Sequence, residues 1–215
     1  DREVLGEYCF PSEPVHEEKI TFRDLSEYEN VSFQGFRGDI YVKEAVIPEG
    51  ASVIPKSQFF GCRSLEKLHL PESVSVIGDY AFADCHVLKV WESIEKLSLK
   101  SVGTSAFENC YALVSLPDSL TVIEGAAFAG CVSVNKLIFS DTALLKKIGD
   151  HAFRGCRNLK EVYLPDSVEY VGISAFRDCV SLEQISVSEK IKDQPGITEL
   201  EKNCPNARIR FREVN

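Results

Sequence analysis

The chain contains no methionine, has one tryptophan and lacks any long apolar run. A membrane-spanning helix needs roughly 18–20 consecutive apolar residues, so we expect no membrane insertion within this segment. No signal peptide or transit segment is visible, although a processed chain would have lost one. Because methionine is missing at position 1 as well, we expect a chain trimmed at its N-terminus.

Motifs for catalysis and metal binding are also missing. The chain has no G-x-S-x-G, H-E-x-x-H, G-x-G-x-x-G or Walker A string and no C-x-x-C pair. Its net charge is −9, with scattered rather than clustered lysines, which is the opposite of a nucleic-acid-binding footprint. We therefore expect no enzyme, no catalytic residues, no cofactor, no metal and no nucleic-acid partner. The histidines are far apart and occupy different repeat positions, at His16, His69, His86 and His151.

What the chain does contain is a repeat. Phenylalanines recur every 21 to 26 residues, and from Phe59 onward each is followed three residues later by cysteine. A sequence that repeats at this period is typical of a solenoid. The phenylalanines of this column are Phe10, Phe36, Phe59, Phe82, Phe107, Phe128, Phe153 and Phe176.

Each half of the repeat has a physical interpretation. The unit reads C-x-x-L-x-x-[LIV]-x-L-P-[DE]-S-V-x-x-[IV]-G-x-x-A-F-x-x over about 23 residues. The [LIV]-x-L element alternates as a half-buried strand does, and proline ends it. The glycine suits a tight corner with positive φ, and A-F-x-x-C is short enough for one helical or 3-10 turn that buries its phenylalanine. We predict a curved solenoid with a parallel sheet on one face and short strands or helical turns on the other.

The string A-F-x-x-C-x-x-L-x-x-I-x-L-P resembles the BspA-like, or Treponema pallidum type, leucine-rich repeat, and the resemblance covers residues 4–211. It implies an α/β right-handed solenoid whose strands line the concave face, forming a single domain over 1–215 of about eight turns, with a degenerate C-terminal turn at 200–215. It further implies a cell-surface or secreted protein of a bacterium or host-associated protist that binds proteins or attaches cells.

Cysteines occupy one column of the repeat, which argues against a disulfide framework. Neighbouring turns stack about 4.8 Å apart, and parallel Cβ vectors hold the Cβ atoms farther apart than the roughly 3.5–4.5 Å of a disulfide. We expect buried free thiols. Asp39 and Glu13 replace cysteine in the first turns and either accept backbone N–H bonds or lie open to solvent. The column cysteines are Cys62, Cys85, Cys110, Cys131, Cys156, Cys179 and Cys204, and Cys9 is off register.

The exposed side of the strands is the candidate binding surface. Opposite charges on neighbouring turns predict lateral pairs between Lys43 and Glu66, Glu44 and Lys67, Lys136 and Glu161, and Lys160 and Glu183. Exposed apolar or aromatic residues are better anchors for a partner. We expect a protein partner, on a host or neighbouring cell, with a glycan still open; a face of self-satisfied pairs would instead indicate a passive spacer or stalk. The candidate partner-binding residues are Lys136, Ile138, Glu161, Tyr163, Gln184 and His69.

The central turns depart from the unit. The turn from Cys85 to Cys110 lacks the L-P element and contains Trp91, and the next turn is shortened, with Pro117 arriving early. We expect irregular rungs here, and a notch in the sheet beside the candidate surface.

Overall fold

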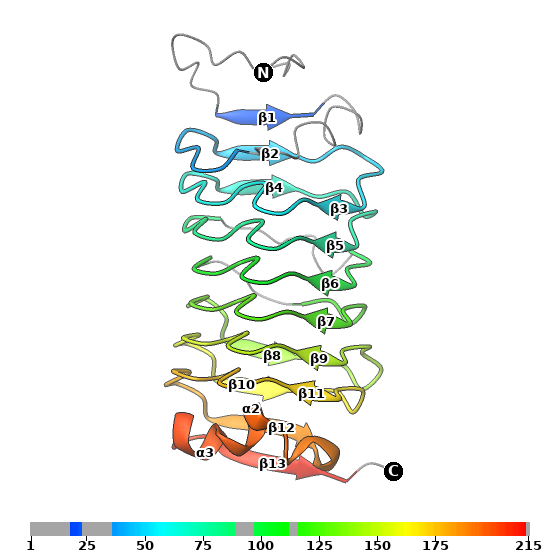
Figure 1. Cartoon of the computed structure of the whole chain (residues 1–215), viewed down its shortest axis with the longest axis vertical. Coiled ribbons are helices and arrows are strands. Elements are labelled where there is room, and N and C mark those ends of the chain that lie inside the picture. The colour runs from blue at the N-terminus through cyan, green and yellow to red at the C-terminus, as the bar shows by residue number, and fades with distance from the viewer. Residues whose placement is uncertain (1–17, 23–35, 89–96, 112–115, 214–215) are drawn as a thin grey trace.

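The computed structural model describes residues 18–22, 36–88, 97–111 and 116–213. These residues form a parallel-strand solenoid of about 7 turns with few helices, and the predicted fold class is confirmed. Figure 1 shows the turns as rungs stacked along the long axis, from the N-terminal end to the C-terminal end.

The first strand of each turn is the predicted [LIV]-x-L element. These strands form two parallel sheets, one with the order β1-β2-β4 and the other with the order β13-β12-β10-β8. The corresponding segments of the two irregular central turns, residues 89–96 and 112–115, lie outside the described residues. The strands are β1 (Lys19–Thr21), β2 (Glu44–Val46), β4 (Lys67–His69), β8 (Lys136–Ile138), β10 (Glu161–Tyr163), β12 (Gln184–Ser188) and β13 (Arg208–Arg212).

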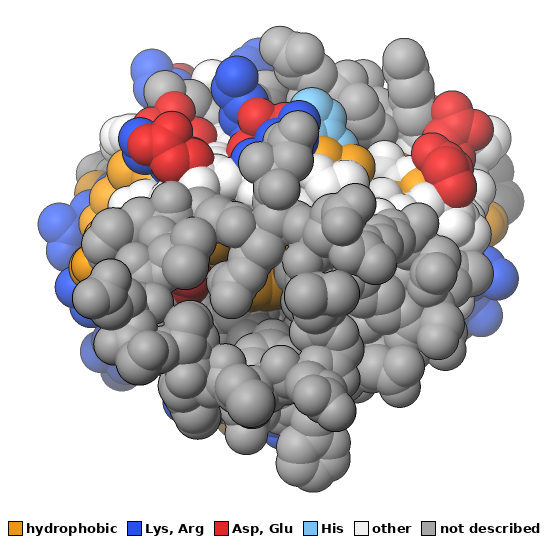
Figure 2. All heavy atoms as spheres, turned by 90° about the horizontal axis from the view of Figure 1, so that it is seen from above, with side chains coloured by type: hydrophobic (Ala, Val, Ile, Leu, Met, Phe, Trp, Pro, Cys, Tyr) orange, Lys and Arg blue, Asp and Glu red, His pale blue; other side chains and the backbone are white. Residues whose placement is uncertain are grey.

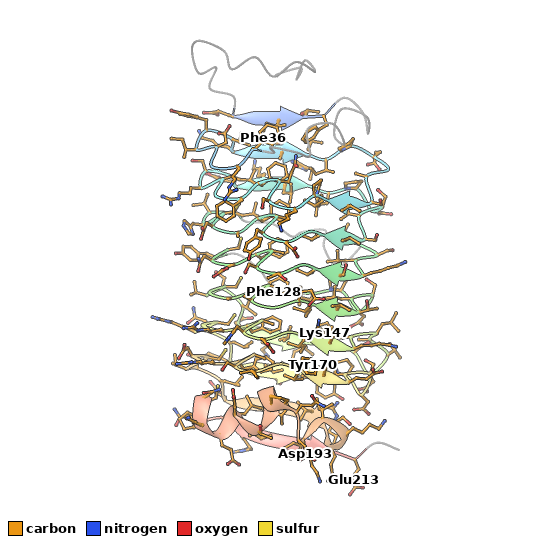
Figure 3. The ribbon with its side chains drawn as sticks, in the orientation of Figure 1. Phe36, Phe128, Lys147, Tyr170, Asp193 and Glu213 are labelled. Carbon is orange, nitrogen blue, oxygen red and sulfur yellow. The ribbon has the colours of Figure 1, made fainter. Side chains whose placement is uncertain are left out.

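The second strand of each turn is shorter and belongs to one continuous sheet. This sheet has the order β11-β9-β7-β6-β5-β3, and all its neighbours are parallel. Figure 3 shows Lys147 and Tyr170 on neighbouring rungs of it. The strands are β3 (Val53–Ile54), β5 (Val76–Ile77), β6 (Ser101–Val102), β7 (Val122–Ile123), β9 (Lys147–Ile148) and β11 (Tyr170–Val171).

The phenylalanine column fills the interior between the sheets. Ring centroids of successive phenylalanines from Phe36 to Phe176 lie 5.2 to 5.7 Å apart, with nearly parallel planes. Each ring from Phe59 onward is at most 1% exposed, and Figure 3 places Phe128 inside the stack. The predicted burial of this column is confirmed, and each ring supports the turns on both sides of it.

The cysteine column forms a second ladder. Each thiol donates to the carbonyl oxygen of the phenylalanine one rung earlier, with Sγ···O distances of 2.9 to 3.3 Å from Cys62 to Cys204. All seven described cysteines are free and buried, as predicted, while Cys9 lies outside the described residues. Cysteine suits this column because it is small and carries a weak donor. Burial raises the pKa of Cys110 and Cys156 to about 12.

The glycine column has a different cause from the one predicted. Its members do not have positive φ; instead, a Cβ on Gly78 would lie 2.8 Å from the backbone nitrogen of Lys56, and one on Gly149 would lie 2.6 Å from that of Gly125. Real Cβ atoms do not approach backbone this closely, so Gly78 and Gly149 lack a Cβ where successive rungs touch. The expectation of a positive-φ corner at this column is wrong.

Positive φ occurs on both sides of each column phenylalanine from Phe59 to Phe176. One column lies two residues before it, as at Tyr80 (φ 56°), and the other two residues after it, as at Asp84 (φ 61°). Asp, Asn or Gly fills the second column, the types that tolerate this conformation best. The segment is therefore a series of i→i+3 turns, such as Cys85 N–H to Phe82 O at 3.1 Å. These turns have the hydrogen bond of the predicted 3-10 turn, but the positive φ values on both sides prevent a continuous helix.

Asp39 replaces cysteine in its column by making local hydrogen bonds. Its Oδ1 accepts from the backbone N–H groups of Tyr41 at 2.7 Å and Val42 at 3.0 Å. This arrangement is an Asx-type turn, which satisfies a partly buried carboxylate. The first of the two predicted roles is thus correct for Asp39, while Glu13 lies outside the described residues.

The last turn replaces the phenylalanine segment with short helices. η2 (Glu189–Ile191), α2 (Pro195–Thr198) and α3 (Leu200–Asn203) come between β12 and β13. Cys204 keeps its place in the column, because its thiol bonds to Phe176 O at 3.2 Å. The turn is joined to its predecessor by Glu199, whose Oε2 accepts from the Ser174 backbone N–H at 3.0 Å.

Candidate interaction surface

The strand face, defined as the outward side chains of β1, β2, β4, β8, β10, β12 and β13, carries the predicted site residues. Side chains alternate along each strand, so Leu137, Val162 and Ile185 point into the core and are at most 3% exposed. The flanking outward residues align across rungs in two rows. One row is Lys136, Glu161, Gln184 and Arg208, and the other is Ile138, Tyr163, Ser186 and Arg210.

In the β1-β2-β4 sheet the strand face is a network of opposite charges. Glu44 Oε1 lies 2.9 Å from Lys19 Nζ and 3.1 Å from His69 Nε2. The hydrogen bond to Lys19 holds the pKa of Glu44 below its ordinary value. His69 is therefore one end of a chain of polar contacts that runs through Glu44 to Lys19 across three rungs.

Lys43 shows how a predicted pair changes partner. Its Nζ lies 2.7 Å from Glu18 Oε1, and this hydrogen bond is the largest cause of the raised pKa of Lys43. Glu66, the predicted partner, adds only the weakest of the electrostatic attractions. A residue in a rung has neighbours on two sides, and the pairing of Lys43 goes to the N-terminal one. Seen down the long axis (Figure 2), acidic and basic side chains lie beside each other along the rim, with a histidine among them.

In the β8-β10-β12-β13 sheet one predicted pair is confirmed. Lys136 Nζ lies 2.9 Å from Glu161 Oε2, and Gln184 Nε2 donates to Glu161 Oε1 at 2.7 Å. The bond from Lys136 lowers the pKa of Glu161. These three candidate residues lie in one row, and each of their side chains already has a polar partner within it.

The second row of this sheet is less polar. Ile138 is 50% exposed and lies directly opposite Tyr163 in the ladder. Tyr163 is half-buried rather than exposed as predicted, because the Arg212 guanidinium carbon lies 4.0 Å from the centroid of its ring. Its hydroxyl donates to Asp141 Oδ1 at 2.5 Å, and this bond raises the pKa of Tyr163. The ring is thus held in one orientation beside an open isoleucine.

Arg212 is the residue that the sequence interpretation missed. From β13 its guanidinium donates to Ser186 Oγ at 2.9 Å, to Leu164 O at 2.6 Å and to Asp166 Oδ1 at 2.9 Å. It therefore fastens the last strand to a rung two strands away. The period-2 alternation of Arg208-Ile209-Arg210-Phe211-Arg212 is the sequence signal that could have identified this strand.

The six candidate residues do not form one site. Five lie together on β8, β10 and β12, whereas His69 lies on β4 in the other sheet. The rungs that contain β6 and β7 lie between them, which amounts to a separation of about 14 Å at the usual strand spacing. We define the five, Lys136, Ile138, Glu161, Tyr163 and Gln184, as the C-terminal patch.

Other chemistry is limited in the described part of the chain. Its His, Cys, Asp and Glu side chains form no group of three or more that could hold a metal ion. None of its helices is long and apolar enough to cross a membrane. Residues 1–17, which include His16, lie outside the described residues. So do Trp91 and the segment 112–115, which precedes Pro117.

Comparison with known proteins agrees with this architecture. The family model described as BspA type leucine rich repeat region matches in 6 copies, over residues 3–116, 29–142 and 100–196. None of the curated proteins matches the chain in sequence.

Solved structures with the same fold come from several bacteria. The leucine-rich repeat protein of Treponema pallidum is 29% identical with a TM-score of 0.58, and the match covers 68% of each chain. A leucine-rich repeat protein of Bacteroides ovatus is 22% identical, with a TM-score of 0.52, covering 91% of this chain and 64% of that one. A leucine-rich cell surface protein of Faecalibacterium prausnitzii is 22% identical, with a TM-score of 0.50, covering 84% and 62%. The chain thus spans about two thirds of the length of these structures.

Proposed function

Since this chain belongs to the BspA type leucine-rich repeat family, we propose that it is a non-catalytic, protein-binding module of a cell-surface or secreted protein. Leucine-rich repeat solenoids generally serve as scaffolds for protein interaction. The description of the Faecalibacterium prausnitzii relative as a cell surface protein supports the location. Adhesion to a host or neighbouring cell is the use we infer for such a module.

The observation that carries the proposal is the C-terminal patch. Ile138 exposes half of its surface beside Tyr163, whose ring is fixed by Arg212 and Asp141. A rigid aromatic next to an open apolar side chain, bordered by polar groups, has the composition of an interface anchor. Because the anchor is already ordered, binding would lose little side-chain entropy.

The alternative is a passive spacer, and a different observation favours it. On the strand face of the β1-β2-β4 sheet, Glu44 is already satisfied by an ion pair with Lys19 and a hydrogen bond with His69. Such a surface has few groups left to attract a partner. We assign the spacer role to this N-terminal sheet and the binding role to the C-terminal patch.

The test compares two isoleucines with the same exposure. Ile138 is 50% exposed on the patch, and Ile173 is 48% exposed in the turn after β11. A protein partner is first captured on the immobilised chain from surface extracts of cells of the natural environment and identified. Its affinity is then measured for wild type, Ile138→Asp and Ile173→Asp.

We expect Ile138→Asp to weaken binding more than tenfold, or about 1.4 kcal/mol, and Ile173→Asp to leave it unchanged. Equal affinity of both variants and wild type would remove the patch as the binding site. A glycan array run alongside distinguishes the other ligand class, because saturable glycan binding without a protein partner would contradict the proposal.

A further inference from the structure

We propose that the open edge of β13 binds an extended, acidic strand from a partner protein by adding it to the sheet. This surface is separate from the C-terminal patch, because it consists of the backbone edge of one strand and the side chains that flank it. β13 is the terminal strand in its sheet among the described residues, and Figure 1 shows it as the last rung of the stack.

The backbone of β13 has donors and acceptors directed away from the sheet. Its pairing with β12 is parallel over all 5 residues, and Arg208 N–H donates to Glu183 O at 2.8 Å. Hydrogen-bonding groups alternate sides along a strand, so the N–H and C=O groups of Ile209 and Phe211 face the opposite edge. An unpaired edge of this kind is a template for another strand.

Side chains next to this edge define what the added strand must present. On the strand face Arg208 and Arg210 are exposed, whereas Arg212 is already engaged by Asp166 at 2.9 Å. Arg208 and Arg210 therefore form a local positive region in a chain whose net charge is −9. This contrast favours an acidic partner strand, whose carboxylates would lie opposite Arg208 and Arg210.

On the core side the edge is apolar. Phe211 lies opposite Val187, which is fully buried, yet Phe211 is 45% exposed because no further rung covers it among the described residues. Ile209 is partly buried against the core. An added strand that alternates acidic and apolar residues would continue both the charge pairing and the hydrophobic stacking of the solenoid.

The test uses a synthetic peptide in which glutamate alternates with valine over the five residues that β13 spans. Binding to the whole chain is followed by fluorescence anisotropy. A lysine-valine peptide tests charge, and a peptide with proline at a central position tests strand addition, because proline cannot donate to a ladder. The protein variants are Arg208→Glu with Arg210→Glu, and the control Arg63→Glu with Arg157→Glu, which changes the same charge at two other exposed arginines.

We expect saturable binding of the glutamate peptide, at least a tenfold loss with the Arg208/Arg210 variant and with the proline peptide, and no loss with the control variant. Ile138→Asp should bind the peptide normally, so failure here is distinct from failure of the C-terminal patch. If the lysine peptide and the proline peptide bound as tightly as the glutamate peptide, the proposal would be overturned. A dimer of the chain that the Arg208/Arg210 variant dissociates would also overturn it, because the edge would then belong to a second copy.

Discussion

The interior of this solenoid and its strand face follow opposite rules. Inside, every rung from Phe59 to Phe176 repeats the same ring and the same thiol hydrogen bond. Outside, equivalent positions hold a histidine in one rung, an isoleucine in another and a half-covered tyrosine in a third. The repeat therefore specifies the stack, while the residues that differ between rungs are free to specify a partner.

The same contrast exists between the two sheets of the strand face. In β1-β2-β4 the outward Glu44 is joined to Lys19 by an ion pair and to His69 by a hydrogen bond. In β8-β10-β12-β13 a polar row lies beside Ile138 and the clamped Tyr163. Since the backbones are equivalent, the difference between a charge-satisfied surface and an anchor surface lies in a few side chains.

The largest expected effect is that of alkaline pH on the interior. A buried thiol stays neutral, and burial raises the pKa of Cys110 and Cys156 from 9.0 to about 12 and that of Cys204 to about 11. The unfolded chain loses these protons first. Below pH 9 the buried thiols are protonated in both states, so they do not lower the free energy of unfolding. As the pH rises from 9 toward 12, the unfolded chain loses these protons and the folded chain keeps them, so the free energy of unfolding should fall.

Thiol labelling checks this order. Alkylation at neutral pH should label few column cysteines in the native chain and all of them in denaturant. As the pH rises, Cys204 in the last turn should react before Cys110, because its pKa is the lower of the two. Disulfides between column members, detected by mass spectrometry, would contradict the thiol ladder.

Next in size is the loss of one ring from the phenylalanine column. Phe128 is fully buried between Phe107 and Phe153, with ring centroids 5.4 Å away on each side. Phe128→Ala should cost about 3–5 kcal/mol and open the adjacent rungs in hydrogen exchange, because a solenoid is held by nearest-neighbour contacts. Ile138→Ala on the strand face is the comparison, with a change within about 0.5 kcal/mol. Unchanged exchange in Phe128→Ala would show that the ring supports only its own turn.

A smaller effect is expected in the glycine column, and Gly125, which lies one position after the column because Glu124 occupies it in that rung, provides the comparison. A Cβ on Gly149 would lie 2.6 Å from Gly125 N, whereas a Cβ on Gly125 meets only Asp150 O, at 3.3 Å. Gly149→Ala should cost about 1–3 kcal/mol by overpacking. Gly125→Ala should cost less, because the entropy lost by the unfolded chain offsets the tighter contact. Denaturant midpoints measure both, and equal midpoints would mean that the rungs can separate at no cost.

The repeat made the interior predictable from the sequence. Register alone placed the phenylalanine and cysteine columns correctly, because each position is dictated by the one a turn earlier. It could not choose between neighbours on the strand face: Lys43 has a carboxylate one rung away on either side, and pairs with Glu18. Nor could the repeat show why glycine occurs in its column. Close contact between rungs and positive φ both favour glycine, and only the structure shows that the contact is the cause.

The clamp on Tyr163 was unpredictable for another reason. Arg212 belongs to the turn that departs most from the repeat, and its partner Leu164 is 48 residues earlier in the sequence. Helices α2 and α3 lie between β12 and β13, so Arg212 follows local structure that the repeat does not encode. The repeat register therefore placed the candidate residues on the strand face, whereas the fixed orientation of Tyr163 required the structure.

The smallest expected effect is that of a strand-face ion pair on stability. Lys136 and Glu161 lie 2.9 Å apart, with side chains that are 61% and 31% exposed. A double-mutant cycle of Lys136→Ala and Glu161→Ala should give a coupling of about 0.2–1 kcal/mol. The cycle is needed because Glu161→Ala alone also frees Gln184, which donates to the same carboxylate at 2.7 Å. The coupling should shrink as salt is raised, since water and ions reach the pair. A larger coupling that does not change with salt would show that this pair stabilises the fold as the buried columns do. The division between a uniform core and a variable strand face would then not hold at this rung.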